Sequence, residues 1–272
     1  MDYATVDQDT SIIIKWRVST DYTRSNYKDL LLYKSSWQGT QVKSFKPVSA
    51  EYNDRRVGVD GNRYVYYTRV TDECGDTSMA SGIACNILVQ SLSDGTFDPP
   101  EFRWNQYRNW AGGIKHYEVQ RLNKDNLFET VHITTDTTFM DEHATDLCMK
   151  QYIYRVIATE QTTNSQDVQD ISTSNHIRIR PRSSLFVPNA FTPNHNGLNE
   201  IFAPKGQYIY NYQLEIYNRW GERVFISNEC LGGWDGTYKG EAADEGIYYY
   251  KLDAFGNDGK IYSYKGLLTL LH

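Results

Sequence analysis

Oxygen-bearing side chains crowd one short stretch near the C-terminal end of the chain. Asn194, Asn196, Asn199 and Glu200 lie within seven residues of one another. Amide carbonyls and carboxylates are hard oxygen ligands of the kind that bind calcium. Asn and Gly residues also satisfy the backbone of tight loops. Because the stretch holds a single carboxylate, we favour the loop interpretation and expect no cofactor, with calcium as the alternative.

Histidines offer little for metal or acid–base chemistry. Asp141, Glu142 and His143 are consecutive, so a strand would point neighbouring side chains to opposite faces. The sequence contains no His-Glu-x-x-His zinc motif, no Gly-x-Ser-x-Gly elbow, no phosphate-binding loop and no dinucleotide fingerprint. We therefore expect no enzyme. The six histidines are His116, His132, His143, His176, His195 and His272.

Four cysteines are present, and two of them flank a glycine-containing stretch. Cys74 and Cys85 could face each other across a hairpin, where cysteines can lie within bridging distance. We predict a disulfide between Cys74 and Cys85, with two buried free thiols as the alternative. Their spacing and the lack of a Cys-x-x-Cys pair disfavour zinc. The sequence leaves open whether Cys148 pairs with Cys230.

Aromatic residues make up 14% of the chain, led by 22 tyrosines. Aromatic rings can stack on sugars, because each pairs an apolar face with a polar edge. Trp37 and Trp110 lie in loop-like surroundings, which makes them candidates for binding a surface glycan. Most other aromatics alternate along strands, where core packing and cross-strand pairing explain them.

Alternating apolar and polar positions predict an all-β fold with short helices or none. Landmarks recur at a fixed offset: Trp16 and Trp104 are 88 residues apart, as are Tyr64 and Tyr152. The repeat predicts two copies of a unit of about ninety residues, the size of one β-sandwich. The net charge is −6, so the chain lacks the excess of basic residues that is typical of a nucleic-acid-binding protein.

Turn-rich stretches mark two boundaries, Ser91–Gly95 and Arg180–Ser184. They predict three tandem β-sandwich domains, at residues 1–92, 93–182 and 183–272. Within the last domain we expect a first strand from Leu185 to Ala190.

The first two domains resemble fibronectin type III and immunoglobulin-like sandwiches. The resemblance rests on an early Trp, on Tyr-x-Val-x-Arg at 117–121 and on Tyr-x-Tyr-x-Val-x-Ala at 152–158. It implies that Tyr64 and Tyr152 form tyrosine corners, in which the hydroxyl bonds back to the backbone. The first copy departs from the pattern at Thr68, where an apolar residue is expected.

Five motifs in order carry a second resemblance, at residues 185–272. They are Pro-Asn-Ala-Phe-Thr-Pro-Asn at 188–194, Asn-Arg-Trp-Gly-Glu at 218–222, Gly-Trp-Asp-Gly at 233–236, Gly-Ile-Tyr-Tyr-Tyr at 246–250 and Gly-Leu-Leu-Thr-Leu-Leu at 266–271. This segment resembles the gliding-motility-associated C-terminal domain of Bacteroidetes, the type B sorting domain of the type IX secretion system. The resemblance implies export through the periplasm and across the outer membrane, to the cell surface or the medium.

The resemblance also implies partners: the type IX secretion translocon and an outer-membrane β-barrel shuttle or anchor protein. Two features depart from the family pattern, namely fewer carboxylates in residues 194–200 and His272 where the family commonly has Arg. The closing strand, Tyr262–Leu271, could dock by strand addition or through an apolar patch. Candidate recognition residues are Asn194, Asn196, Asn199, Glu200, Arg219, Trp220, Trp234, Asp235, Leu271 and His272.

Together these patterns predict the C-terminal region of a longer surface protein of the adhesin or gliding-motility type. The last domain would be its export signal, and the first two domains would be structural spacers. In the alternative, the first two domains form a carbohydrate- or protein-binding module.

Overall fold

A computed structural model describes residues 2–17, 27–46, 50–92, 99–108, 110, 112–144, 146–162 and 169–271. Every regular element within these ranges is a β-strand, so the predicted all-β class is confirmed. No described element is a helix long and apolar enough to cross a membrane.

The chain divides into two compact units. The first comprises Met1–Leu92, Glu101–Met140 and Ile153–Arg178, and the second comprises Ser93–Pro100, Asp141–Tyr152 and Ile179–His272. The finer division into three domains at 92/93 and 182/183 stays a prediction.

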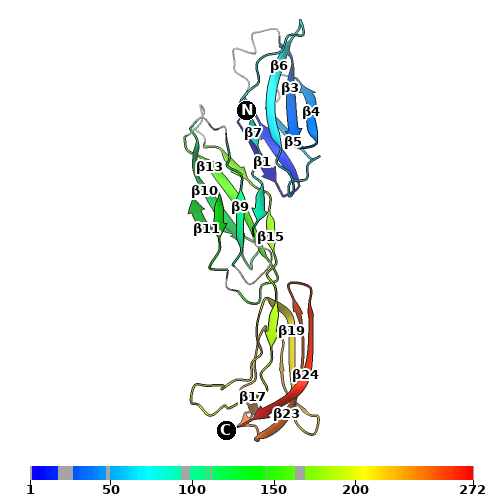
Figure 1. The fold of residues 1–272 in the computed structure, drawn as a ribbon, viewed down its shortest axis with the longest axis vertical. Helices are drawn as coiled ribbons and strands as arrows, with labels where there is room; N and C mark the ends of the chain where they lie inside the picture. Colours follow the sequence, from blue (N-terminus) through cyan, green and yellow to red (C-terminus); the bar gives the residue numbers. More distant parts are fainter. Residues whose placement is uncertain are drawn as a thin grey trace. The chain divides into compact units, whose positions relative to one another are not determined.

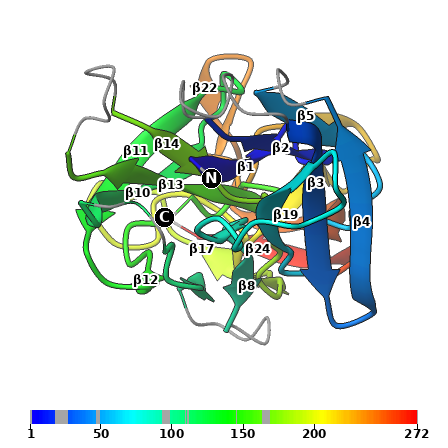
Figure 2. The ribbon, with the colours of Figure 1, turned by 90° about the horizontal axis from the view of Figure 1, so that it is seen from above.

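Residues 2–92 form two sheets around one core (Figures 1 and 2). The first sheet has the order β1-β2-β5, from β1 (Tyr3–Asp7), β2 (Ser11–Lys15) and β5 (Glu51–Asp54). The second has the order β4-β3-β6-β7, from β3 (Tyr27–Ser36), β4 (Gly39–Phe45), β6 (Val65–Asp72) and β7 (Ala84–Cys85). The alternating residues Ile12, Ile14 and Trp16 are buried between them, as the period-2 pattern predicts.

The next stretch repeats this arrangement. One sheet has the order β12-β9-β8, from β8 (Val89–Ser91), β9 (Glu101–Trp104) and β12 (Thr138–Met140). The other has the order β11-β10-β13-β14, from β10 (Ile114–Leu122), β11 (Phe128–Thr134), β13 (Tyr152–Glu160) and β14 (Ile171–Thr173). A further strand, β15 (Ile177–Ile179), also pairs with β13.

Both tyrosine corners form, each between residues six positions apart in the sequence. The Tyr152 hydroxyl donates to the Asp146 carbonyl at 3.0 Å. The Tyr64 hydroxyl accepts a bond from the Gly58 backbone N–H, also at 3.0 Å. The repeat visible in the sequence is therefore a repeat of local hydrogen bonding.

Hydrogen bonds tie β1 to residues of the second repeat within the first unit. The Tyr107 hydroxyl accepts from the Ala4 N–H at 3.0 Å and lies 3.4 Å from the Ala4 carbonyl. The Ser172 hydroxyl donates to the same carbonyl at 2.7 Å. Asp9 pairs with Arg178 at 3.1 Å. The two repeats are joined by specific buried contacts as well as by the chain itself.

The C-terminal stretch is built on one five-stranded sheet (Figure 1). Its order is β17-β24-β23-β19-β20, from β17 (Ala190–Phe191), β19 (Ile209–Tyr217), β20 (Arg223–Ser227), β23 (Gly246–Gly256) and β24 (Ile261–Leu270). Two small sheets accompany it, β16 (Ser184–Phe186) with β18 (Lys205–Gln207), and β21 (Thr237–Tyr238) with β22 (Glu241–Ala242).

The predicted strand from Leu185 to Ala190 is two separate strands. β16 pairs antiparallel with β18, whereas β17 pairs parallel with the end of β24. Pro188 lies between them, and proline lacks the N–H that a continuous ladder needs. The break lets one short segment serve two sheets.

The predicted disulfide between Cys74 and Cys85 is wrong. Cys85 lies opposite Val65 at the start of β6, whereas Cys74 follows Asp72 at the end of β6. Seven residues of strand span roughly 23 Å, far beyond bridging distance. Both thiols are free, with Cys74 exposed and Cys85 buried. The disulfide joins Cys148 to Cys230, with 6.0 Å between their Cα atoms.

Candidate recognition surface

Several sequence motifs meet at one end of the five-stranded sheet. Residues 218–222 join β19 to β20 at this end, where β23 begins and β24 finishes. Because β17 runs parallel to β24, the loop 192–200 that follows β17 starts at the same end. Figure 1 shows the C-terminus beside β17. We define the terminal face as loop 192–200, turn 218–222 and the exposed side chains of Ile247, Tyr249, Leu267 and Leu271.

Loop 192–200 uses its polar side chains to hold its own backbone. The Glu200 carboxylate accepts the backbone N–H groups of His195 at 2.9 Å and Gly197 at 2.8 Å. These bonds, chiefly the one from His195, lower the pKa of Glu200. Asn194 Oδ1 accepts the Asn196 N–H at 3.2 Å. The side-chain oxygens therefore close the loop from inside.

The same geometry bears on calcium. Asn196 Oδ1 accepts the Leu198 N–H at 2.9 Å, and the Asn199 carbonyl accepts the Thr192 N–H at 2.8 Å. His195 and Asn199 have φ values of 63° and 54°, the left-handed conformation that Asn tolerates well. Among the described residues no three His, Cys, Asp or Glu side chains gather as a metal site. The side-chain oxygens of Asn194, Asn196 and Glu200 thus accept backbone N–H groups of the loop itself.

Turn 218–222 is held in place by the Asn218 side chain and exposes its tryptophan to solvent. Asn218 Oδ1 accepts the backbone N–H groups of Trp220 and Glu222, both at 3.0 Å. Trp220 is 73% exposed, with the Arg219 guanidinium carbon 4.2 Å from its ring centroid. Glu222 accepts the Tyr238 hydroxyl, a bond that lowers the pKa of Glu222.

Trp234 and Asp235 of the Gly-Trp-Asp-Gly motif make contacts within the domain that stabilise its fold. Trp234 is fully buried, 5.5 Å from the Phe191 ring and 5.0 Å from the Tyr248 ring. Its indole N–H donates to the Thr237 carbonyl at 2.8 Å. Asp235 Oδ1 accepts the Thr237 hydroxyl at 2.7 Å and its N–H at 2.9 Å, which lowers the pKa of Asp235.

Trp234 therefore cannot touch a partner directly, although the sequence singles it out for recognition. Gly233 explains its tight seating, because a Cβ there would lie 2.6 Å from the Phe202 carbonyl oxygen. Gly236 has a φ of 82°, which completes the turn that Asp235 caps. The motif positions the terminal face from within the core.

Sequence reasoning missed three exposed apolar residues of the terminal face. Tyr249 is directly opposite Leu267 on β24 and Tyr217 on β19, and Ile247 lies two residues earlier on the same outer face. Ile247, Tyr249 and Leu267 are 55%, 51% and 54% exposed. The available signal was their alternation with buried Tyr248. Leu271 is 46% exposed, and His272 lies outside the described residues.

The closing strand is only partly an open edge. β24 pairs along its whole length with β23, and Thr269 and Leu270 also pair with Ala190 and Phe191 of β17. In the described part of the chain no strand pairs with the other side of residues 261–268. Because β17 already pairs with Thr269 and Leu270, no further strand can add to the edge of β24 at these two residues.

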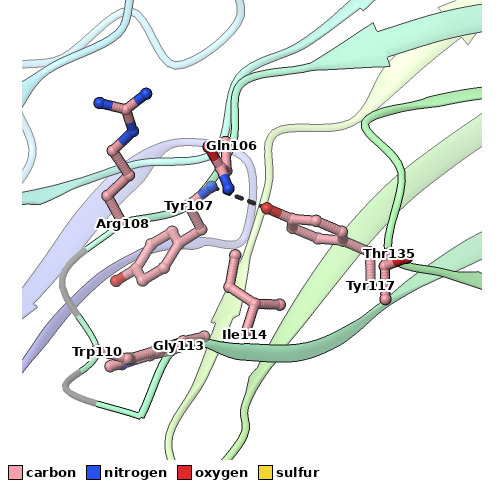
Figure 3. Close-up of a pocket in the computed structure, with 8 residues that line it drawn as sticks. All are labelled: Gln106, Tyr107, Arg108, Trp110, Gly113, Ile114, Tyr117 and Thr135. Atoms are coloured by element: carbon pink, nitrogen blue, oxygen red, sulfur yellow. Dashed lines mark hydrogen bonds between the residues drawn. The ribbon is translucent and has the colours of Figure 1, made fainter.

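The two glycan candidates lie in different repeats. Trp110 is buried and packs 4.4 Å from the Tyr107 ring centroid, beside a cavity of about 430 Å³ (Figure 3). The dashed line in Figure 3 joins the Tyr107 N–H to the Tyr117 hydroxyl, 2.9 Å apart. Trp37 is 79% exposed, and its indole N–H donates to Asn62. The structure does not bring the two tryptophans into one site.

The fold and the terminal face together define an all-β protein that ends in a small module with a prominently exposed surface. Residues 185–270 match the family model described as the CHU_C Type IX secretion signal domain. The secretion machinery recognises such a signal, which directs export across the outer membrane to the cell surface or the extracellular space. The matched segment contains every residue of the terminal face except Leu271.

Three solved structures are similar to the chain at low identity. A tetra-tandem repeat from the extending region of a large adhesion protein is 11% identical, with a TM-score of 0.36, covering 98% of this chain and 73% of that one. A two-domain fibronectin type III segment of chicken tenascin is 13% identical, with a TM-score of 0.27, covering 64% and 93%. The FN1–FN3 domains of chicken CNTN1 are 12% identical, with a TM-score of 0.24, covering 100% and 98%. No curated protein matches the chain.

Proposed function

We propose that this chain is the C-terminal region of a non-enzymatic surface protein of the adhesin or gliding-motility type. Residues 183–272 are its export signal, and residues 1–182 are spacers between that signal and the functional part of the parent protein. The observation that carries the proposal is the secretion-signal match at 185–270. The resemblance of the five motifs to the gliding-motility-associated domain supports a source among Bacteroidetes.

The terminal face is the surface that the translocon and an outer-membrane β-barrel shuttle or anchor protein read. Trp220 and Tyr249 are the residue types that dominate binding energy at protein interfaces. Both project from a rigid base, since Asn218 holds the turn and a ladder of paired strands holds Tyr249. Rigid presentation lowers the entropy lost on binding.

The spacer role is supported by where the first unit places its aromatics. Tyr107, Trp16 and Trp104 are all buried, and the Tyr107 hydroxyl bonds to Ala4 across the two repeats. Contacts of this kind stiffen a pair of domains that would otherwise move independently.

A reporter experiment tests the export role. A periplasm-directed fluorescent reporter is fused ahead of residues 1–272 and expressed in a type IX-competent cell. We expect the reporter at the cell surface or in the medium. The matched fusion to residues 1–182 should stay in the periplasm, because it lacks the signal.

Two controls make the result specific. The 1–272 fusion in a translocon-deficient strain should remain in the periplasm, which separates secretion from lysis. Equal release of the 1–182 and 1–272 fusions, or release without the translocon, would contradict the proposal.

A further inference from the structure

A cavity opens on the first repeat between the edges of its two sheets. β4 is the edge strand of one sheet and β5 is the edge strand of the other. Figure 2 shows β4 beside β3, and β5 beside β2. The cavity has a volume of about 300 Å³ and receives side chains from both edges. The polar and aromatic residues that line it are Lys34, Gln41, Lys43, Tyr52, Asp54, Arg56 and Tyr66.

The floor of this cavity is a closed network of polar groups. Asp54 Oδ2 accepts the Lys34 ammonium at 2.9 Å and the Tyr66 hydroxyl at 3.1 Å. Asp54 Oδ1 accepts the Arg56 N–H at 3.0 Å, and Lys34 donates to the Arg56 carbonyl at 2.8 Å. Burial, reinforced by Asp54, raises the pKa of Tyr66, so its phenol remains a donor. One positive and one negative charge cancel here, and the floor is rigid.

The mouth of the cavity carries positively charged side chains that pair with no carboxylate in the described part of the chain. The Lys43 ammonium lies 4.1 Å from the Tyr52 ring centroid and 5.4 Å from that of Phe45. In the described ranges no carboxylate forms an ion pair with Lys43 or with the Arg56 guanidinium, and the Gln41 amide has no hydrogen-bond partner. Lys43, Arg56 and Gln41 thus line a cavity on a protein whose net charge is −6.

From this arrangement we propose that the cavity binds a uronic acid unit of an acidic polysaccharide. The sugar carboxylate lies between Lys43 and Arg56, whose charge-assisted hydrogen bonds are stronger than neutral ones. The Gln41 amide meets ring hydroxyls, and Tyr52 holds the Lys43 ammonium at the mouth through its ring face.

The cavity size favours a sugar over an acidic peptide. Small-molecule sites begin at about 300 Å³, enough for one sugar ring with its substituents. A single Asp or Glu side chain would leave much of that space empty. The site is separate from the terminal face, so it stands or falls independently of the export signal.

Calorimetric titration of the intact 272-residue protein tests the inference, with trigalacturonate as the probe at low ionic strength. We expect saturable binding at one site per chain. Lys43→Gln and Arg56→Gln should each weaken it about tenfold, the effect of losing one charge-assisted hydrogen bond. Methyl-esterified trigalacturonate, which keeps the ring but loses the charge, should bind about tenfold more weakly than the acid.

Lys46→Gln is the matched control, because Lys46 lies one residue past β4, is exposed and pairs with Asp29 at 3.7 Å. It should bind as the unaltered protein does. Thermal unfolding confirms that each variant is folded. The inference is overturned if trigalacturonate does not bind saturably, if Lys46→Gln loses as much affinity as the cavity variants, or if a hexaglutamate peptide binds as tightly.

Discussion

Residues 1–182 and residues 183–272 differ in how many aromatic side chains they expose. Among the described residues, Trp37 is the one exposed aromatic before position 183, whereas five follow it. Those five are Phe186, Trp220, Tyr249, Phe255 and Tyr264. Apart from Trp37, the described aromatics of the front part are buried or half-buried. The last part exposes several of them, and exposed apolar surface is typical of a protein that meets a partner.

The contrast also runs inside the C-terminal segment. Trp220 and Trp234 both stand next to glycine in short turn motifs, yet one is 73% exposed and the other is fully buried. Asn218 caps the turn that presents Trp220, and Asp235 caps the turn that seats Trp234. Similar local chemistry thus supports two different roles, which single substitutions can separate.

The largest effect should come from Trp234→Ala. Removing a fully buried tryptophan leaves a cavity among Phe191 and Tyr248, and we expect a loss of about 3–5 kcal/mol in the free energy of unfolding. Trp220→Ala should change that free energy by less than about 0.5 kcal/mol. Urea denaturation followed by tryptophan fluorescence and circular dichroism measures both. Equal losses would contradict the assignment of one ring to the core and the other to the surface.

Cys230→Ser should rank next. It opens the disulfide to Cys148, which is 82 residues away in sequence, and loop-closure entropy predicts a loss of about 4.5 kcal/mol. The unfolding transition of the second unit, followed by calorimetry, should move to lower temperature. Cys74→Ser is the control, because Cys74 is free and exposed. A larger shift for Cys74→Ser would contradict the observed pairing.

Tyr107→Phe tests the joint between the repeats. It leaves the ring in place but removes the hydroxyl that serves the buried Ala4 N–H, so we expect a loss of about 1–3 kcal/mol. The transition of the first unit should shift while that of the second unit stays fixed. Hydrogen exchange at the Ala4 amide should also accelerate; an unchanged exchange rate would contradict the contact.

The smallest effect concerns pH. Burial lowers the pKa of His176 from 6.5, although nearby Asp9 opposes the change; Arg155, Arg178 and Asp60 also act on it. A depressed pKa means that the unfolded chain binds the proton more readily. This contribution to stability is therefore present above pH 6.5 and is lost as pH falls through the lower folded value. Thermal unfolding should show a steeper decline below pH 6.5 than in His176→Gln, and parallel curves would contradict this.

Local patterns predicted much of the fold, because alternation and turn residues act over a few positions. Ile12, Ile14 and Trp16 line the core as their spacing indicates, and both tyrosine corners close over six residues. Side chains of the Asn194–Glu200 loop also bind its own backbone, as the loop interpretation of its composition predicts.

Contacts between residues far apart in the sequence could not be predicted from local patterns. Cys74 and Cys85 are near in sequence but lie at opposite ends of β6, whereas Cys148 reaches Cys230 across 82 residues. Whether Trp234 is buried depends on Phe191 and Tyr248, from other strands. The outward row of Tyr217, Tyr249 and Leu267 exists only once strand register is known.

The most direct measurement compares export of point variants in the 1–272 reporter fusion. Leu267→Asp and Ile261→Asp place the same charge on two exposed positions of β24, 54% and 67% exposed: Leu267 lies on the terminal face and Ile261 at the start of the strand. If the terminal face is what the secretion machinery reads, Leu267→Asp and Trp220→Ala should reduce export severalfold at unchanged urea midpoint, while Ile261→Asp exports normally. Equal export by all three, or an equal loss at Ile261, would contradict the account.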